Sequence, residues 1–253
     1  MLDALDRALD RSLDVLQGGR RTTARHRSLR SVVEWSYGLL GPGQRTLFDR
    51  LSVFAGPVEY AAIVDVCGNA DYLPDLVDRS LVVRTPGEPV RFGMLETLRA
   101  FGRSRIAAST EGVRLRPRHA VWARRLADEV SADRRGPGEG AAVRRFDAHL
   151  ADLRRAHAWL CESGPVADLL RLTMPFAELA YLWGRIDLVR VTEQTLRVVG
   201  AFDTDSGPAT PAAHPLVARL LGVYAATWWQ RGDLDTAERC ARRAIAIAES
   251  VGE

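Results

Sequence analysis

The chain has 253 residues, and 47% of them are hydrophobic, which is enough for one large domain or two to three small ones. All 35 basic residues are Arg, and the 32 acidic residues leave a net charge of only +3, so charge gives little support for nucleic-acid binding. Because the sequence has no Lys, it cannot contain a phosphate-binding loop of the type G-x-x-x-x-G-K-[ST]. The catalytic motifs H-E-x-x-H, G-x-S-x-G and C-x-x-C are also absent from the sequence. We therefore expect no enzyme activity from this chain.

The N-terminal residues 1–20 are expected to form a helical tail. Its leucines recur at spacings of three and four and so line one helix face, namely Leu2, Leu5, Leu9, Leu13 and Leu16. After the loop "QGGRRTTAR", the stretch "RSLRSVVEWSYGLL" (27–40) predicts a second helix. The side chains expected inside it are Leu29, Val32, Val33, Trp35, Tyr37 and Leu40.

Residues 21–110 as a whole predict a winged helix. "QRTLFDRLSVF" indicates a helix with Leu47, Phe48 and Leu51 inward, and "EYAAIVDVCG" and "YLPDLVDRS" indicate two more. The segments "LVVRT" and "VRFGM" read as two strands joined by the turn residues "PGEP". A further helix starts directly at Leu95, with Leu98, Phe101 and Ile106 on the same face.

Residues 111–200 predict a helical connector with degenerate repeats. The expected helices are 115–132, 141–163, 165–182 and 185–199, with "STEG" (109–112) and "RRGPGEG" as breaks. Residues 200–215 are rich in Pro, Gly, Ser and Thr and indicate a polar linker. The fold class is therefore mainly α, a winged helix followed by a tetratricopeptide-like array.

Residues 216–253 predict one tetratricopeptide repeat, two helices joined at Gly232. The residues at the expected helix-contact positions, which would pack the repeat or line a partner groove, are Leu221, Ala225, Trp228, Gly232, Ala237 and Ala244. "WGRIDLVRVTEQTLR" is a weaker copy when Gly184 is laid on Gly232, although any helical hairpin with a Gly corner would look similar. Because small residues near the end still need a neighbour, we expect a fragment of a larger protein.

The helix at the DNA-recognition position of this winged helix is "YLPDLVDRS". It sets Asp71, Asp75 and Asp78 against Arg79 alone, and carboxylates repel the phosphate backbone. We therefore expect protein contacts, with direct DNA contact unlikely to come from this chain.

The remaining side chains predict structural roles. The scattered Cys67, Cys161 and Cys240 and the absence of an apolar run of about 18 residues indicate a cytoplasmic protein with reduced thiols and no membrane partner. Trp183, Trp228 and Trp229 are expected to pack, and Arg124 to pair with Asp128. No metal site is expected, because the histidines are dispersed and predict surface or cap roles (His26, His119, His149, His157 and His214).

The stretches "RHRSLRSVVEWSYGLLGPGQRTLFDRLSVFAG", "LVDRSLVV" and "RFGMLETLRAFGRSRI" resemble the winged-helix part of STAND-type signalling ATPases. These are NB-ARC relatives found in bacterial transcriptional regulators of the SARP and LuxR types. The resemblance implies that residues 1–20 end an ATPase module encoded outside this chain. It also implies ATP or ADP as the cofactor of the parent protein, with none in this fragment.

In that family a Met-His-Asp motif at the strand-to-helix junction senses the nucleotide. The matching residues here are Met94, Leu95 and Glu96, a nucleotide-sensor-like motif in which Leu95 cannot donate a hydrogen bond to a phosphate. A mechanical role against the ATPase module is therefore favoured. The alternative is that Met94 and Leu95 are core residues and Glu96 is a helix cap.

The function expected is regulatory, coupling the state of a nucleotide-binding module to a protein or small-molecule effector on the helical repeats. The partners would be the ATPase module of the same polypeptide and that effector. Two alternatives stay open: a self-standing winged-helix DNA-binding transcription factor, and a tetratricopeptide scaffold without switching.

Overall fold

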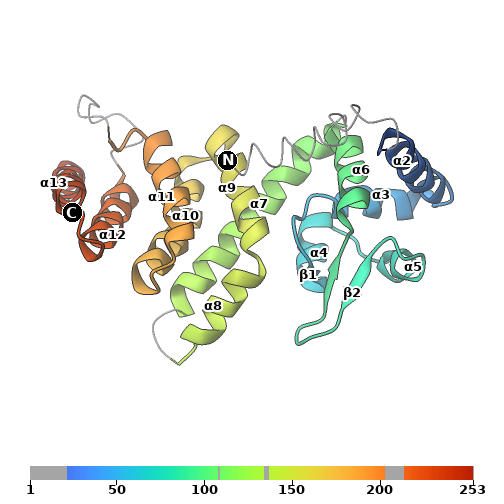
Figure 1. Cartoon of the computed structure of the whole chain (residues 1–253), viewed down its shortest axis with the longest axis horizontal. Coiled ribbons are helices and arrows are strands. Elements are labelled where there is room, and N and C mark those ends of the chain that lie inside the picture. The colour runs from blue at the N-terminus through green and yellow to red at the C-terminus, as the bar shows by residue number, and fades with distance from the viewer. Residues whose placement is uncertain (1–21, 108, 134–136, 203–213, 253) are drawn as a thin grey trace. The chain divides into compact units, whose positions relative to one another are not determined.

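A computed structural model describes residues 22–107, 109–133, 137–202 and 214–252, and the helix predicted for 1–20 lies outside them. The fold is mainly α with one small sheet, as predicted (Figure 1). The chain divides into two compact units, residues 1–115 and 116–253. None of the helices in the described ranges combines the length and apolar character needed to span a bilayer.

The described part of the first unit contains two helices, a short strand, two more helices, a hairpin and a further helix. Its elements are α2 (Thr22–Gly38), α3 (Pro42–Leu51), β1 (Val58–Glu59), α4 (Tyr60–Cys67), α5 (Leu73–Asp78), β2 (Val83–Thr85), β3 (Arg91–Gly93) and α6 (Glu96–Ala107). Apart from β1, the order from α3 onward is the order of helices and hairpin predicted for this region.

The sheet has three strands in the order β1-β3-β2, where the sequence predicted two. Both pairings are antiparallel, and β3 is central, with Phe92 opposite Val58 on one side and Arg84 on the other. Strand β1 was missed because its two residues run straight into α4, so they show no strand period. An ion pair between Arg91 Nε and Glu59 Oε1, 3.0 Å apart, joins its end to β3.

Helix α3 lies at the centre of the first unit and packs against α4, α5 and α6. Leu47, Phe48 and Leu51 are buried as predicted, and Phe48 is fully enclosed. Gly102 of α6 is also buried, and a Cβ there would lie 2.8 Å from the Cβ of Ser52. The α3–α6 contact is therefore so close that it requires glycine.

The prediction for α2 was partly wrong. Val33, Tyr37 and Leu40 are buried at spacings of four and three, but Val32 is exposed and Trp35 is 68% exposed. One helix face can cover only one stripe of the core, and positions 32 and 35 point away from that stripe. The side chain of Leu29 lies outside the described part of the structure.

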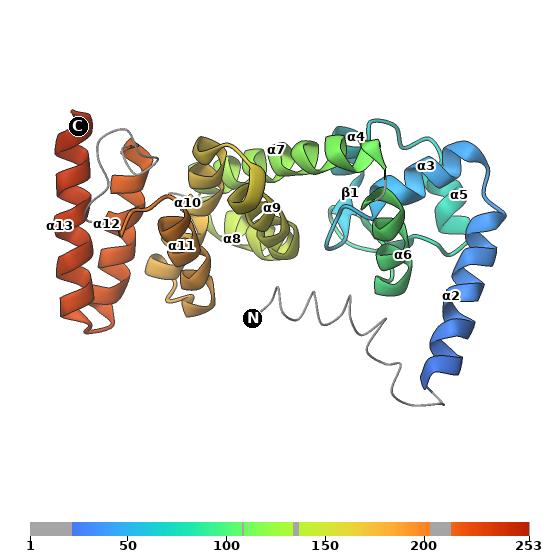
Figure 2. The same ribbon diagram turned by 90° about the horizontal axis from the view of Figure 1, so that it is seen from above.

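The second unit is entirely helical in its described residues. Its elements are the main part of α7 (Thr110–Asp133) and then α8 (Glu139–Ala148), α9 (Leu150–Ser163), α10 (Val166–Leu182), α11 (Ile186–Val198), α12 (Pro215–Gln230) and α13 (Leu234–Val251). Helices α10 to α13 lie side by side in both views (Figures 1 and 2), and each contacts the next.

Three predicted helix boundaries were wrong. The first is in the first unit, where α2 starts at Thr22, inside the loop predicted for "QGGRRTTAR". Helix α7 starts at Thr110, inside the expected break, and Gly112 allows it because a Cβ there would lie 2.4 Å from the carbonyl oxygen of Ile106. The predicted helix 141–163 is two helices that meet at His149, whose φ of −112° and ψ of 11° leave the helical region. His149 is buried, with its ring edge-on to Trp122 at 5.5 Å.

Two helical hairpins turn at a left-handed glycine, as the internal similarity predicted. Gly184 between α10 and α11 has a φ of +63°, and Gly232 between α12 and α13 has a φ of +82°. Asp233 then caps α13, because its Oδ1 accepts a hydrogen bond from the N–H of Thr236 at 3.1 Å. The glycine corner is therefore common to both hairpins.

Candidate functional site

The strand-to-helix junction is nearly direct, since β3 ends at Gly93 and α6 begins at Glu96. Met94 is half-buried and lines a small gap in the core with Phe54 and Phe92, whereas Leu95 is 57% exposed. The alternative that both residues are core therefore fails for Leu95. Its side chain is at the surface because α6 turns its buried face, Leu98 and Ile106, to the other side.

Glu96 pairs with two arginines of its own helix. Its carboxylate accepts a hydrogen bond from Arg99 Nη2, and another from Arg103 Nη2 at 2.9 Å. Arg99 also donates to the carbonyl of Ala55, just after α3. Burial raises the pKa of Glu96, but the hydrogen bonds and charges of Arg99 and Arg103 outweigh burial and lower it overall. The junction therefore carries a charged carboxylate held in place by arginines.

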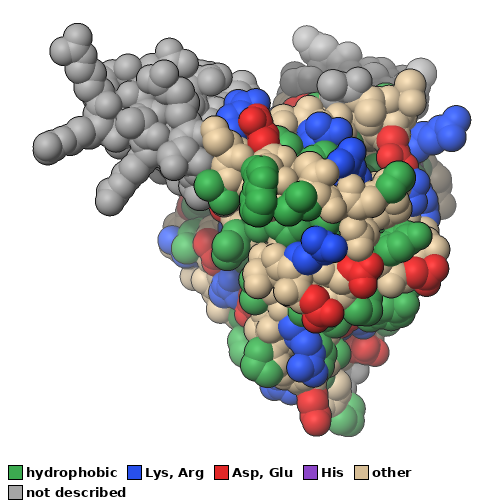
Figure 3. All heavy atoms as spheres, turned by 90° about the vertical axis from the view of Figure 1, so that its right-hand side faces the viewer, with side chains coloured by type: hydrophobic (Ala, Val, Ile, Leu, Met, Phe, Trp, Pro, Cys, Tyr) green, Lys and Arg blue, Asp and Glu red, His purple; other side chains and the backbone are tan. Residues whose placement is uncertain are grey.

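Helix α5 is the helix that the winged-helix prediction sets at the DNA-recognition position, and the acidic residues in it and just before it are exposed. Asp71, Asp75 and Asp78 all lie at the surface, and Asp75 accepts a hydrogen bond from Gln44 Nε2 of α3 at 2.7 Å. On the face seen from the side of α2 and α5 (Figure 3), acidic and basic side chains are interspersed. Neither this helix nor that face presents the basic surface that phosphate contacts need.

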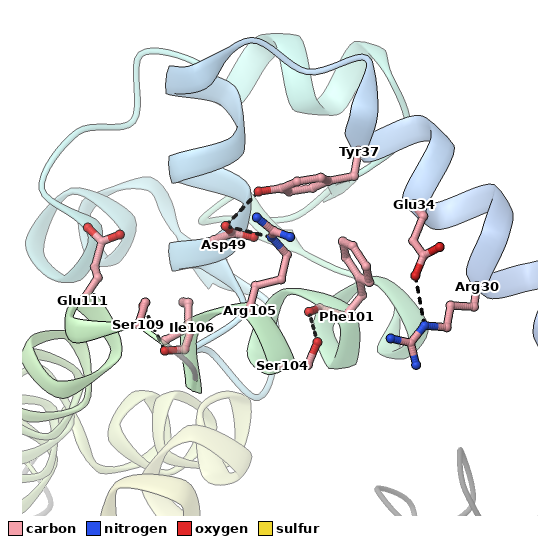
Figure 4. Close-up of a pocket in the computed structure, with 10 residues that line it drawn as sticks. All are labelled: Arg30, Glu34, Tyr37, Asp49, Phe101, Ser104, Arg105, Ile106, Ser109 and Glu111. Carbon is pink, nitrogen blue, oxygen red and sulfur yellow. Dashed lines mark hydrogen bonds and ion pairs between the residues drawn. The ribbon is translucent and has the colours of Figure 1, made fainter.

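A cavity of about 690 Å³ opens between α2, α3, α6 and the start of α7, all in the first unit (Figure 4). Tyr37, Asp49 and Arg105 meet in it. The Tyr37 hydroxyl donates to Asp49 Oδ2 at 2.9 Å, and Arg105 Nε donates to the same oxygen at 3.3 Å. The Arg105 guanidinium also lies over the Tyr37 ring, 4.3 Å from its centroid, which is a cation–π contact.

Burial dominates the electrostatics of this cluster. It raises the pKa of Asp49, although Tyr37 and Arg105 act in the opposite direction. The pKa of Tyr37 is also raised, first by burial and then by its hydrogen bond to Asp49. The second carboxylate oxygen of Asp49, Oδ1, is buried and accepts no hydrogen bond from the described residues. Asp49 is therefore an incompletely satisfied acceptor at the wall of a cavity.

A second ion pair borders the cavity. Arg50 Nε of α3 donates to Glu111 Oε1 at 2.7 Å, and its Nη1 donates to the carbonyl of Cys67 at 2.7 Å. This arginine ties the start of α7 to α3 and to the end of α4. Arg30 Nε and Glu34 Oε1 of α2, 3.0 Å apart, form a third pair at the cavity wall.

In the second unit, the predicted repeat positions lie in and around the α12–α13 hairpin. Leu221, Ala225 and Ala237 are buried, while Trp228 and Ala244 are half-buried. Trp228 packs edge-on to Tyr224 at 6.0 Å, within the same helix. The predicted packing roles of Trp183 and Trp229 were wrong, since they are 51% and 65% exposed. The predicted pair of Arg124 and Asp128 is present at 2.5 Å.

The prediction for the histidines was wrong at three positions. His119, His149 and His157 are buried, because helices distant in sequence converge on them. His119 Nε2 lies 2.9 Å from Asp152 Oδ1, which pairs α7 with α9. His214 caps α12 with its side chain, which accepts a hydrogen bond from the N–H of Leu216 at 3.1 Å. His149 holds the cap position between α8 and α9 without a side-chain cap hydrogen bond. The His26 side chain lies outside the described residues.

A second buried polar chain joins α9, α10 and α11. His157 Nε2 lies 2.7 Å from Thr195 Oγ1, which in turn lies 2.8 Å from Thr173 Oγ1. Such networks make a helical core specific for one packing arrangement. No group of three or more acidic, His or Cys side chains suited to a metal is found within the described part of the chain.

Sequence reasoning missed the Tyr37–Asp49–Arg105 cluster. Tyr37 was predicted as a core residue, but Asp49 and Arg105 lie 56 positions apart and on different helices. Each has the spacing of an ordinary surface residue on its own helix. No local signal could have joined them, because the contact exists only when α6 packs on α3.

No family model matches the chain. Over 174 residues it is 30% identical to proteins that carry the name HTH-type transcriptional regulator, from Mycobacterium bovis and from two strains of Mycobacterium tuberculosis. The match covers 65% of this chain but only 20% of each relative, so the chain spans about a fifth of their length. The chain is thus similar to part of a transcriptional regulator.

Among solved structures, the chain is similar to a signal transduction ATPase with numerous domains (STAND) that has a tetratricopeptide repeat sensor, from Pyrococcus horikoshii. The TM-score is 0.39 at 16% sequence identity, over 86% of this chain and 33% of that chain. A similarity of this size carries no argument about function.

Proposed function

We propose that this chain is the regulatory and protein-interaction part of a STAND-type transcriptional regulator, with no catalysis of its own. The winged-helix unit contacts a nucleotide-binding module of the same polypeptide that binds ATP or ADP. The helical repeats bind a protein or small effector in the cytoplasm. Effector binding then shifts the population between packed and released arrangements, because it favours one of them.

The acidic α5 is the observation that carries the proposal. The relatives bear the name of transcriptional regulators, yet the helix of this chain at the recognition position presents Asp71, Asp75 and Asp78 to solvent. Each carboxylate repels a phosphate, and α5 offers no base-reading Arg, Asn or Gln within its own length. A winged helix of this kind is suited to contacts with protein, so DNA contact is assigned to another part of the regulator.

The strand-to-helix junction supports a contact with the nucleotide-binding module. An exposed Leu95 lies next to Glu96, which Arg99 and Arg103 hold in place, so the junction presents one apolar and one charged group on a rigid base. The Met94-Leu95-Glu96 segment transmits the state of that module by packing.

DNA titration of this chain tests the proposal against a self-standing DNA-binding factor. We expect only weak, sequence-independent binding to duplex DNA at physiological salt. Replacing Asp71, Asp75 and Asp78 by Asn should strengthen that weak binding more than the same charge change on α13. The α13 control changes Asp235, Glu238 and Glu249. Tight, salt-dependent binding by the unmodified chain would establish the DNA-binding alternative.

Hydrogen exchange of the full-length protein tests the switch. We expect ADP and ATP to give different amide exchange rates at residues 94–99, since the junction contacts the nucleotide-binding module. Identical rates with both nucleotides would favour the tetratricopeptide scaffold without switching. Leu95→Asp should remove the difference, whereas Val83→Asp, at another exposed apolar position of the same unit, should not.

A further inference from the structure

The cavity between α2, α3, α6 and the start of α7 has the size of a ligand site. Its volume is about 690 Å³, within the range of roughly 300–1,000 Å³ that small-molecule pockets occupy. It is formed by described residues of the first unit alone, so it exists independently of the repeat array. Nothing in the proposed function uses it.

The walls of the cavity carry charges of both signs. Arg30 and Arg105 contribute two guanidinium groups, and Glu34, Asp49 and Glu111 contribute three carboxylates (Figure 4). A ligand with a single charge would therefore meet both attraction and repulsion. A ligand with a positive and a negative group can match both sets, which is the electrostatic complementarity that gives specificity.

Arg105 and Asp49 are arranged to receive the two charges of one small molecule. Arg105 has five N–H donors, and its ion pair with Asp49 uses the one on Nε. Asp49 Oδ2 lies only 3.3 Å from that Nε. This separation is similar to that between the ammonium nitrogen and the carboxylate oxygens of an α-amino acid. A carboxylate on Arg105 therefore leaves the ligand ammonium beside the carboxylates of the cavity.

The remaining wall is apolar. The half-buried ring of Phe101 and the buried Ile106 line the same cavity from α6, and the Tyr37 ring packs edge-on to Phe101 at 5.3 Å. Ser104 and Ser109 donate their hydroxyls to backbone carbonyls, so these side chains need no further hydrogen-bond acceptor. This surface suits an apolar or aromatic side chain on the ligand.

We propose that this cavity binds a zwitterionic small molecule, an amino acid or short peptide with an apolar or aromatic side chain. Resting on the proposed function, the ligand acts as an effector of the first unit. It contacts Arg30 and Glu34 of α2 together with Phe101 and Arg105 of α6, and so holds α2 against α6. A ligand that binds only this packed arrangement increases its population.

Calorimetric titration of the whole chain with L-phenylalanine tests this site. We expect saturable binding, and at least about tenfold weaker binding of phenylacetate, which lacks the amine, and of phenethylamine, which lacks the carboxylate. Arg105→Gln should weaken L-phenylalanine binding by about tenfold or more. Absence of binding by L-phenylalanine and by every other apolar amino acid and dipeptide at millimolar concentration overturns the proposal.

Two matched variants of α6 place the binding in the cavity. Ser104→Leu adds a large side chain to the cavity wall and should abolish binding, whereas Thr97→Leu makes a similar change at an exposed position outside the cavity and should not. Circular dichroism of both variants is the check that they fold. Binding that survives Ser104→Leu overturns the proposal. These measurements use neither DNA nor nucleotide, so their result is independent of the tests of the proposed function.

Discussion

Gly102→Ala is expected to destabilise the first unit by up to about 2 kcal/mol. An added Cβ would lie 2.8 Å from the Cβ of Ser52, whereas ordinary contacts are 3.4 Å or longer, so α3 and α6 must separate by roughly 0.6 Å. Overpacking of this kind costs about 1–3 kcal/mol. Alanine recovers about 1 kcal/mol because it favours the helix more than glycine does.

The net change in the free energy of unfolding on Gly102→Ala is expected to be destabilising, because Ser52 cannot move away from the added Cβ. It is fully buried at the end of α3, and its hydroxyl donates to the carbonyl of Asp49 at 2.6 Å. The Phe48 ring closes the other side, 3.5 Å from the added Cβ. The strain also reaches the cavity, since Phe101 and Arg105 are neighbours of Gly102 on α6.

Urea denaturation followed by circular dichroism measures the effect. Gly38→Ala is the matched control in the same unit, because a Cβ there meets nothing within 4 Å and should stabilise by up to about 1 kcal/mol. Ser52→Gly removes the opposing Cβ, so in combination with Gly102→Ala it should cost less than the two single changes together. If Gly102→Ala were as stable as Gly38→Ala, the close α3–α6 contact would be refuted.

Two further predictions concern buried carboxylates. Burial raises the pKa of Asp49, so the folded protein holds that proton to higher pH than the unfolded chain, and the free energy of unfolding should fall as pH rises through the raised pKa. Asp49→Asn should lose this dependence in urea titrations that start near pH 4, about the ordinary pKa of Asp, and continue upward, and an unchanged profile would contradict the assignment. Asp152→Ala leaves the buried His119 without this hydrogen-bond partner and should cost about 1–3 kcal/mol. The double change His119→Leu with Asp152→Leu should cost less in thermal unfolding, and an equal or greater loss would argue against a buried pair.

Local pattern was enough to predict most of the helices and the hairpin. The 3.6-residue period placed α3, α10 and α11 within a few residues, and the similarity between the two hairpins placed a glycine corner at 184 and at 232, whose left-handed backbone the structure adds. These features depend on interactions within a few residues, so the identities of neighbouring residues predict them. Strand β1 was not predicted, because a strand of two residues is too short to show an alternating pattern. Its pairing partner Phe92 also lies far along the chain.

Burial of individual side chains was less predictable. Val32 and Val33 are adjacent and chemically identical, yet of the two only Val33 is buried. The reason is that only one face of α2 packs against the rest of the first unit. The burial of the dispersed histidines was equally hard to predict from the sequence. His119 has the pattern of a surface residue on α7 until α9 brings Asp152 to within 2.9 Å.

The sequence by itself determined the class of the fold, the acidic character of α5 and the absence of a lysine-based phosphate loop, since each follows from residue identity and local spacing. The tertiary structure alone decided that Tyr37, Asp49 and Arg105 share one cavity, and that Leu95 faces solvent. The physical reason is that such contacts form between helices whose relative orientation is set by close packing at positions such as Gly102. The spacing of residues along a single helix does not predict that orientation.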